Sequence, residues 1–578
     1  MAGLTYAPQS VRAASRLGWR DIVLFIGFFG LLIGILHLTH QMRAPFTATT
    51  SVAINLSPLA LPGYAARSLL RMFLAFGASL LFTFVYGYIA AYNKAAEKIL
   101  VPLLDILQSV PVLGFLSITV TGFMALFPGS ILGLECASIF AIFTAQAWNM
   151  TFSFYQSLRT IPKELREAAT IYQLNWWQRF VKLELPFSMI GLVWNGMMSF
   201  GGGWFFLAAS EAISVLGNNF KLPGIGSYMA TAVEKGDTHA VAWAIVTMIA
   251  VVLLVDQLFW RPVVAWSQKF KFEATDSADE PSSVLLNMLR HSVALAWVER
   301  RILPPLGRSV NALFARGEQM ARQASLPKAA QRVAQILLLT ALAALAAYGL
   351  FRGARAVSSE LTWAIAIHVL YLGFLTLLRV ATMVVLATVI WTPIGVRIGF
   401  SPRLARIAQP LVQIGASFPA NLIFPVMVLV FIRLHINLNW GSVLLIALGT
   451  QWYILFNVIA GASAVPGDLR EAALVFRLRG WMLWRTLILP AIFPAWVTGA
   501  LTAAGGAWNA SIVAELASWG PRQLRAQGLG AYVADATTKG DWPAIILGIG
   551  VMSLYVVLLS RLVWKPLYAL AENRFRLG

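Results

Sequence analysis

The stretch Leu165-Arg166-Glu167-Ala168-Ala169, which runs on to Leu185-Pro186, is a polar island between long apolar runs. A second copy, Leu469-Arg470-Glu471-Ala472-Ala473, runs on to Leu489-Pro490. Each copy combines good helix formers, a charged face and a closing Leu-Pro at which a new helix can start. The two copies therefore predict short helices outside the bilayer, each placed between two membrane spans and available to dock another protein.

The composition identifies the class of protein around these islands. Hydrophobic residues make up 59% of the 578 residues and charged residues only 12%, whereas soluble globular proteins carry about 25% charged residues. We therefore predict an all-α polytopic membrane protein. The net charge of +20 lies mainly in short basic segments beside apolar runs, as the positive-inside rule expects, so we expect no nucleic-acid partner.

Twelve apolar segments have lengths close to the about 20 residues that a helix needs to cross a bilayer. They are 22–38, 66–92, 102–127, 131–157, 186–212 and 239–261 in the first half, and 334–351, 363–393, 411–433, 440–463, 490–515 and 542–563 in the second. Basic residues precede the first segment and no small-residue cleavage site follows it, so we interpret it as an uncleaved span with the N-terminus inside. The basic loops after the second and fourth spans of each half are then cytoplasmic, and so are both termini.

The two halves form an internal repeat. A shift of 304 residues pairs Glu167 with Glu471 without gaps, and upstream the shift becomes 308 and pairs Arg71 with Arg379. Six spans return the chain to its starting side, so the copies are parallel repeats about an axis along the membrane normal. We predict a first repeat at 1–264, a cytoplasmic linker at 265–333 and a second repeat at 334–578.

Two helices are expected in the linker. Apolar residues recur at helical spacing over 284–302 while Arg290 and Arg301 fall on the far side. This segment is either an amphipathic helix on the membrane surface or a helix that packs on the bundle. The second helix is expected over 314–336, with a break at Pro327.

The two islands resemble the coupling motif of ABC importer permeases, in which a cytoplasmic Glu-Ala-Ala element fits a groove on an ATP-binding subunit. The resemblance implies coupling elements at about 162–186 and 466–490. It assigns the contact with the ATP-binding subunit to Arg166, Glu167, Ala168, Ala169, Arg470, Glu471, Ala472 and Ala473.

The sequence departs from this family at one point. The family usually has glycine, with positive φ, four residues after the last alanine of the motif, but this chain has Gln173 and Arg477 there. Neither residue favours that conformation. Because the nearby Asn175 and Gly480 tolerate it better, we expect the turn to be displaced.

Two glycine tracts, each followed by Trp and Glu, resemble the sequences of the nitrate/taurine/sulfonate branch of these importers. The tracts are Gly201 to Gly203 with Trp204 and Glu211, and Gly505-Gly506 with Trp508 and Glu515; a Gly-x-Gly-x-Tyr follows each. Arg71 and Arg379 in the second spans are similar too. The branch imports small anions and zwitterions captured by a binding protein, which implies a type I ABC importer-like fold in the bacterial inner membrane.

This resemblance also implies the partners. Two ATP-binding cassette subunits, an extracytoplasmic solute-binding protein, a small solute and membrane lipid are expected. The chain has no Gly-x-x-x-x-Gly-Lys-Ser/Thr motif, so we expect no cofactor in it and place ATP and Mg on the partner subunit.

The candidate residues of the translocation path or gate recur at matching positions of the two repeats. They are Gly202, Trp204, Glu211, Gly506, Trp508, Glu515, Arg71 and Arg379. The glycines serve either close helix packing or an open path. The arginines either supply positive potential or snorkel to the outer surface.

Charge and symmetry constrain the remaining candidates. A carboxylate at this depth is costly against lipid and would repel an anion, which favours a gating or ion-pair role for Glu211 and Glu515. If Trp204 faces the repeat axis then Trp508 faces it from the other side, and the pair closes a gate.

Two other functional classes remain as alternatives. A secondary transporter or channel also uses repeats, but it needs no matched cytoplasmic islands and commonly has ionisable residues near mid-membrane. A membrane-embedded enzyme would need paired His, a metal cluster or a nucleophile constellation, and the sequence has none of these patterns. The single Cys136 excludes a disulfide within the chain.

Overall fold

The computed structural model describes residues 18–42, 53–215, 218–270, 283–323 and 362–574, together with isolated residues and short stretches between 333 and 355. Within them, seven helices are long and apolar enough to cross a membrane, by length and composition. The fold is therefore an all-α polytopic membrane protein, as predicted. The predicted span 334–351 lies mostly outside the described residues.

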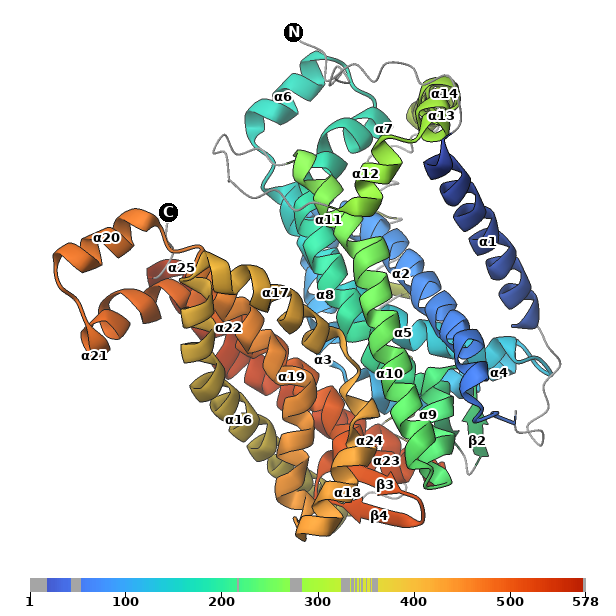
Figure 1. Cartoon of the computed structure of the whole chain (residues 1–578), viewed down its shortest axis with the longest axis vertical. Coiled ribbons are helices and arrows are strands. Elements are labelled where there is room, and N and C mark those ends of the chain that lie inside the picture. The colour runs from blue at the N-terminus through green and yellow to red at the C-terminus, as the bar shows by residue number, and fades with distance from the viewer. Residues whose placement is uncertain are drawn as a thin grey trace.

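The same order of helices occurs twice (Figure 1). After α1 (Trp19–Gln41), the first repeat contains α2 (Leu61–Tyr92), α3 (Lys94–Ser109), α4 (Leu116–Leu126), α5 (Leu132–Arg159), α6 (Lys163–Ile171), α7 (Trp176–Arg179), α8 (Leu185–Glu211), α9 (Ile225–Glu234), α10 (Thr238–Val255) and α11 (Arg261–Ser267). The second repeat contains α16 (Trp363–Gly399), α17 (Pro402–Ser417), α18 (Phe424–Leu434), α19 (Leu438–Ser463), α20 (Gly467–Val475), α21 (Gly480–Leu483), α22 (Leu489–Ala514), α23 (Leu529–Lys539), α24 (Trp542–Leu559) and α25 (Lys565–Arg574).

A small antiparallel hairpin follows the glycine-tract helix of each repeat. It joins β1 (Ala212–Val215) to β2 (Asn218–Lys221), and β3 (Leu516–Trp519) to β4 (Arg522–Arg525). The sequence analysis did not predict these strands, because four residues are too few to show an alternating pattern. Figure 1 places β2, β3 and β4 at one end of the molecule and α6 and α20 at the other.

Two predicted spans are wrong as single helices. Residues 102–127 form the end of α3, the short 3-10 helix η2 (Val112–Phe115) and α4, and 411–433 are divided in the same way by η6 (Ala420–Leu422). Pro111 and Pro419 cause the breaks, because the residue before a proline is driven out of the helical region. Val110 accordingly has ψ 122° and Phe418 has ψ 128°.

The α-helices α8 and α22 begin at Leu185 and Leu489, where the Leu-Pro pairs predicted a new helix, but neither is separated from the helix before it. The chain stays helical from α7 into α8, and from α21 into α22, through the π-helical turns η3 (Phe180–Glu184) and η7 (Trp484–Ile488). Proline has no N–H to donate to an ordinary helical bond, and a wider turn accommodates that loss without ending the helix.

The described part of the linker, 283–323, forms three helices where two were predicted. They are α12 (Val284–Arg290), α13 (Val293–Arg301) and α14 (Leu303–Gln323). Ser292 divides the predicted helix 284–302, since its hydroxyl accepts a hydrogen bond from the N–H of Leu295 and caps α13. The second helix begins at Leu303 rather than at 314, and Pro327 lies outside the described residues.

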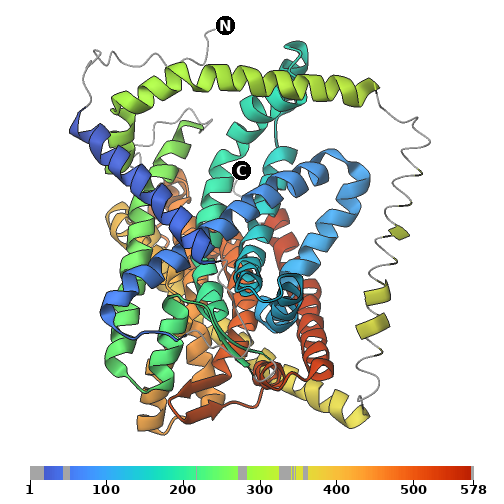
Figure 2. The ribbon, with the colours of Figure 1, turned by 90° about the vertical axis from the view of Figure 1, so that its right-hand side faces the viewer.

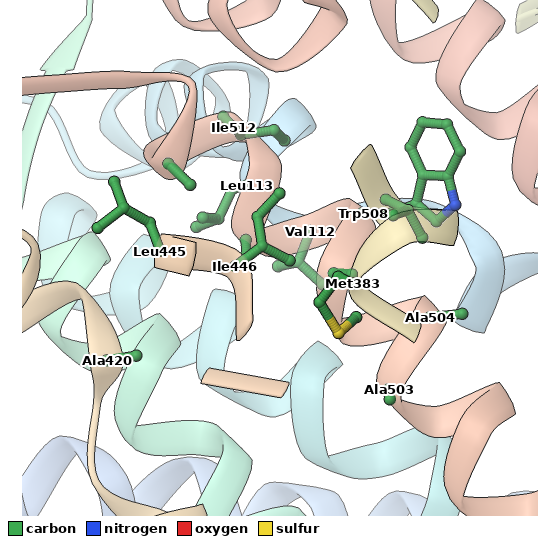
Figure 3. Packing of buried hydrophobic residues seen from close by; sticks show 14 of the residues in the cluster. Val112, Leu113, Met383, Ala420, Leu445, Ile446, Ala503, Ala504, Trp508 and Ile512 are labelled. Atoms are coloured by element: carbon green, nitrogen blue, oxygen red, sulfur yellow. The ribbon is translucent and has the colours of Figure 1, made fainter. Parts of the chain in front are cut away.

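The two repeats interlock through their broken spans. The N–H of Val112 in η2 donates to Asn509 Oδ1 in α22, at 2.8 Å. Symmetrically, Asn421 Nδ2 in η6 donates to the carbonyl of Phe205 in α8, at 3.2 Å. Figure 3 shows Val112 and Leu113 packed in the same apolar cluster as Ile512 of the other repeat. Each break therefore presses against the glycine-tract helix of the opposite repeat.

Candidate functional site

The helices α6 and α20 carry the two predicted coupling motifs and have matching geometry. Arg166 Nη2 donates to the carbonyl of Leu158 at 2.6 Å, and Arg470 Nη2 donates to the carbonyl of Ala462 at 2.8 Å. These bonds tie each helix to the end of the preceding span. In both helices the arginine lies half-buried, the last alanine, Ala169 or Ala473, is buried, and Ala168 and Ala472 are half-buried.

The acidic residues of the two motifs face outward. Glu167 and Glu471 are exposed, and so are Ile171 and Tyr172 after the first motif and Leu474, Val475 and Phe476 after the second. Each element thus presents a carboxylate beside apolar side chains, which is a surface suited to a protein partner.

The turn after each motif is not displaced, contrary to the sequence-based expectation. Gln173 has φ 49° and Arg477 has φ 53°, so both adopt the left-handed conformation at the position where the family has glycine. The N–H of Leu174 donates to Ala169 and that of Leu478 to Ala473, which is the six-to-one bond of a Schellman cap. These capping bonds outweigh the cost of about 1–2 kcal/mol for a left-handed non-glycine residue.

The first predicted coupling element has more polar contacts with its own repeat than the second. Arg179 Nε donates to Glu184 Oε1 at 2.7 Å, and Tyr92 at the end of α2 donates to the same oxygen at 2.6 Å. Burial opposes the charge of Arg179, but its hydrogen bond to Tyr88 and the nearby Glu184 outweigh burial and raise the pKa of the guanidinium. The equivalent residues of the second repeat, Leu483 and Ile488, are apolar.

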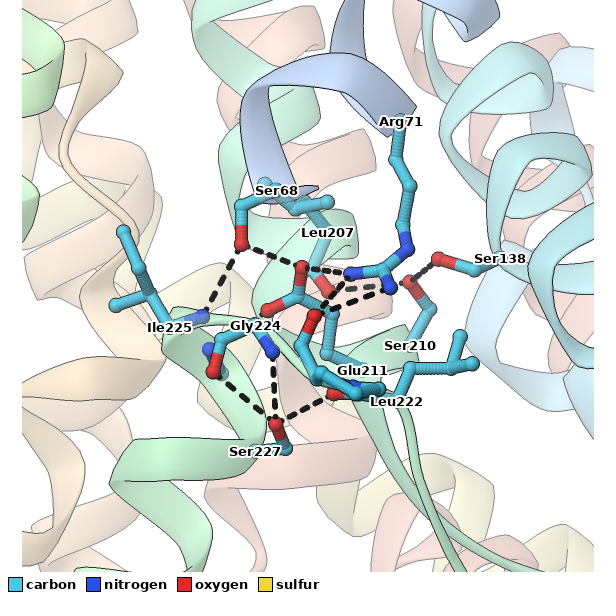
Figure 4. Close-up of polar contacts among 12 residues, drawn as sticks. Ser68, Arg71, Ser138, Leu207, Ser210, Glu211, Leu222, Gly224, Ile225 and Ser227 are labelled. Carbon is cyan, nitrogen blue, oxygen red and sulfur yellow. Dashed lines mark hydrogen bonds and ion pairs between the residues drawn. The ribbon is translucent and has the colours of Figure 1, made fainter. Parts of the chain in front are cut away.

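At the opposite end of the first repeat, Arg71 forms a buried ion cluster (Figure 4). Its Nη1 donates to Glu211 Oε1 at 2.7 Å, and its Nη2 donates to Glu135 Oε1 at 2.8 Å. Ser68 also donates to Glu211, at 2.6 Å, and the carbonyl of Pro223 accepts from the guanidinium. The cluster therefore joins α2, α5, α8 and the segment before α9.

The second repeat builds the same cluster with two side chains changed. Arg379 Nη1 donates to Glu515 Oε1 at 2.8 Å, and Thr376 takes the place of Ser68. Asn439 occupies the position of Glu135 and accepts from Arg379 Nη2 at 3.0 Å. The first cluster thus holds two carboxylates for one guanidinium, and the second holds one.

The Gly-x-Gly motifs have a steric explanation. A methyl group at Gly224 would overlap the carboxylate of Glu211, and one at Gly528 would overlap that of Glu515. The N–H groups of Gly226 and Gly530 donate to the same carboxylates, at 2.7 and 2.8 Å. Only glycine allows the backbone to approach each carboxylate this closely.

The arginines therefore have neither of the roles that the sequence suggested. Arg71 is fully buried and Arg379 is 7% exposed, so neither snorkels. Both guanidiniums are paired with carboxylates, so neither offers free positive potential. The ion-pair role predicted for Glu211 and Glu515 agrees with this geometry.

The two tryptophans of the predicted gate are buried, and the gate itself stays a prediction. Trp204 and Trp508 are each 1% exposed, and Trp204 lines a small cavity with Gln413, Ile414 and Ser417 of the second repeat. Trp204 packs edge-on against Phe200 at 5.6 Å, and Trp508 stacks on Tyr555 at 6.1 Å. These large apolar rings stabilise the fold more when they are buried in a core than when they line a polar path.

The glycines do come together, around a residue that the sequence analysis missed. A methyl group at Gly202 would lie 3.2 Å from the Tyr453 hydroxyl, and one at Gly506 would lie 3.6 Å from Tyr453 Cε2. Tyr453 of α19 therefore bridges the glycine tracts of both repeats. The repeat gave no signal for it, because its counterpart is Asn149, which donates to Ser199 within the first repeat.

A small cavity surrounds this bridge. Its lining includes Gly202, Phe206, Thr450, Tyr453 and Gly506, and none of its lining residues is charged. It encloses about 50 Å³, room for roughly three waters. The space between the repeats is thus narrow at Tyr453.

These features together define a transport permease. They are a repeated bundle of membrane helices, an uncharged cavity on the repeat interface and two matched helices at one end. Comparison with known families gives the same result. The family described as binding-protein-dependent transport system inner membrane component matches residues 83–259 and again 389–576. The chain belongs to this family and is a multi-pass inner-membrane protein with two permease units fused in one polypeptide.

Several curated proteins are similar to the chain. The nitrate import permease protein NrtB of Leptolyngbya laminosa is 27% identical, the bicarbonate transport system permease protein CmpB of Synechococcus elongatus is 27% identical, and the taurine transport system permease protein TauC of Escherichia coli is 26% identical. Each match covers 32% of this chain and 64% of the relative, so the chain spans just under two thirds of the relatives' length. These relatives are permease components rather than enzymes.

Replacing Arg71 by Met should destabilise the folded protein by about 3–5 kcal/mol, because Glu135 and Glu211 would remain buried without a cation. Glu135→Asn is the matched control, since it reproduces the pattern of Asn439 and should cost much less. Thermal unfolding in detergent measures both variants. Equal stability of Arg71→Met and the parent would contradict the structural role of the cluster.

Proposed function

We propose that this chain is the transmembrane permease of an ATP-driven importer and that it couples to separate ATP-binding subunits through α6 and α20. The observation that carries the proposal is the pair of matched elements, each anchored by an arginine to the preceding span and each presenting an exposed glutamate. Two such surfaces at one end of a repeated bundle fit two ATP-binding cassette subunits. ATP and Mg would then be bound by those subunits.

The proposed translocation path runs between α8 and α22, past Tyr453. These helices are equivalent in the repeat, and their glycines Gly202 and Gly506 face one side chain from opposite repeats. A cavity of this size is a closed state, so transport requires Tyr453 to move. Glycine on both sides leaves the ring room to do so.

The lining favours a small, weakly held solute of the kind that the relatives' names indicate, anionic or zwitterionic, such as nitrate, bicarbonate or taurine. Tyr453 and Asn509 offer neutral hydrogen-bonding groups on the cavity. Neutral donors satisfy an anion without the tight binding of a fixed cation, which suits passage. The buried arginines contribute nothing, because their charges are used within the clusters.

The same arrangement sets the proposed orientation. With α6 and α20 in the cytoplasm, the start of α1 and the end of α25 are cytoplasmic as well, since Figure 1 places them at that end. The hairpins and the buried ion clusters then face outward, toward a solute-binding protein. A secondary transporter or channel is disfavoured, because the ionisable residues of the spans form ion pairs away from the cavity.

Charge reversal at both coupling elements, Glu167→Arg with Glu471→Arg, should reduce recovery of the ATP-binding subunits in co-purification at least tenfold, or about 1.4 kcal/mol. The glutamates are exposed, so the permease itself should stay folded. Glu234→Arg with Asp535→Arg, the same reversal at the opposite end, is the control and should leave recovery unchanged. Undiminished recovery with the coupling variant would contradict the assignment.

The glycine tracts allow the path to be separated from helix packing. Gly202→Val should abolish uptake while leaving thermal stability nearly unchanged, because its side chain meets only the Tyr453 hydroxyl. Gly203→Val should instead lower stability, since a methyl group there would lie 2.7 Å from Gln146 Nε2 and Met72 Cε. Gly505→Val, with open space around it, is the neutral control.

Uptake into proteoliposomes and the unfolding midpoint are measured for each of the three variants. The path assignment fails if uptake by Gly202→Val falls only in proportion to the amount of folded protein.

A further inference from the structure

The linker helix α14 has two faces, and the first of them is occupied. Phe314 stacks on Trp177 with ring centroids 4.5 Å apart and an interplanar angle of 12°, and it also contacts Trp176 at 5.5 Å. Glu318, one turn further on, accepts a hydrogen bond from the N–H of Trp176 at 3.3 Å. This face fixes α14 against α7, the second part of the first coupling element.

The other face of α14 is apolar and uncovered. Leu306, Leu313 and Met320 are 56%, 67% and 68% exposed. They recur every seven residues, so they form one stripe along the helix. The stripe is too regular to be scattered surface hydrophobicity, and water is an unfavourable environment for it.

Two anchors place α13 and α14 at the level where spans enter the bilayer. Asp21, which directly precedes the apolar run of α1, accepts hydrogen bonds from Ser292 at 2.6 Å and from the N–H of Ala294 at 3.1 Å. At the far end, α7 is only one π-helical turn away from span α8. Figure 2 shows the linker helix running across this end of the bundle.

The charge of the linker helices matches an anionic surface. Between 284 and 320 the chain carries five arginines and two acidic residues, one of which, Glu318, bonds to Trp176. The arginines are Arg290, Arg300, Arg301, Arg308 and Arg316. An amphipathic helix with an apolar stripe and basic flanks lies in the interface of a membrane that contains anionic lipid.

We infer that α14 is an in-plane membrane helix, with Leu306, Leu313 and Met320 inserted into the anionic cytoplasmic leaflet and Phe314 holding the first coupling element against it. Among the described residues, no linker helix packs in this way on the second coupling element. Trp481, the counterpart of Trp177, is 72% exposed. The bilayer would thus brace one coupling element of the two, which makes the elements mechanically unequal.

The test is fluorescence quenching in the full-length protein carrying Cys136→Ser. Single cysteines at Leu313→Cys and Ala312→Cys receive the same environment-sensitive probe; Ala312 is exposed and lies about 100° around the helix from Leu313, off the apolar stripe. The proteoliposomes contain phosphatidylcholine and phosphatidylglycerol, with nitroxide-labelled lipid as the membrane quencher and iodide as the aqueous one.

We expect lipid nitroxide to quench the Leu313 probe at least twofold more than the Ala312 probe, and iodide to show the reverse preference. Removing phosphatidylglycerol, or combining Arg308→Gln with Arg316→Gln, should reduce lipid quenching at 313. Equal aqueous quenching at both positions would overturn the inference. So would a Leu313 probe that becomes shielded only when ATP-binding subunits are added, because those subunits would then cover the stripe. Neither readout depends on transport, so the inference can fail while the proposed function stands.

Discussion

A guanidinium buried in an apolar bundle must have a carboxylate partner, and this requirement organises the end of each repeat that lies opposite α6 and α20. Leaving either charge unpaired at this depth costs several kcal/mol. Arg71 and Arg379 therefore fix Glu211 and Glu515 at the ends of the glycine-tract helices. The Gly-x-Gly motifs follow from that pairing, since the backbone must pass against the carboxylate. The position of α8 and α22, and with it the proposed path, depends on the two clusters.

The repeats are equivalent in fold but not in chemistry. The first repeat has more charged residues and more ion pairs at these positions than the second. It has Glu135 where the second repeat has Asn439, and it has Arg179 and Glu184 where the second repeat has Leu483 and Ile488. At another pair of equivalent positions, the second repeat has Tyr453, which fills the interface, and the first repeat has Asn149. A fused permease allows such divergence, because one chain encodes both halves and each can change separately. We interpret the first repeat as the braced half and the second as the one that contributes the moving group.

The features that the sequence could predict are local or repeated. The two coupling motifs, the apolar spans and the matched Arg and Glu positions were all visible as patterns. The broken spans were predictable in principle, since Pro111 and Pro419 stand within the predicted ranges, but their apolar flanks suggested continuity. The left-handed Gln173 and Arg477 were not predictable from residue preference, because capping bonds decide their conformation. Nor were Glu135 and Tyr453, whose roles depend on partners far away in the sequence.

Crosslinking across the interface tests the proposed path most directly. Gly202→Cys and Gly506→Cys are combined in a Cys136→Ser background and joined by a short, reducible bis-thiosulfonate reagent. Both positions contact Tyr453 from opposite repeats, so the crosslink should form in the resting protein, abolish ATP-driven uptake into proteoliposomes and release it again on reduction. A crosslinked permease that transports at the rate of the uncrosslinked protein would contradict a path between α8 and α22.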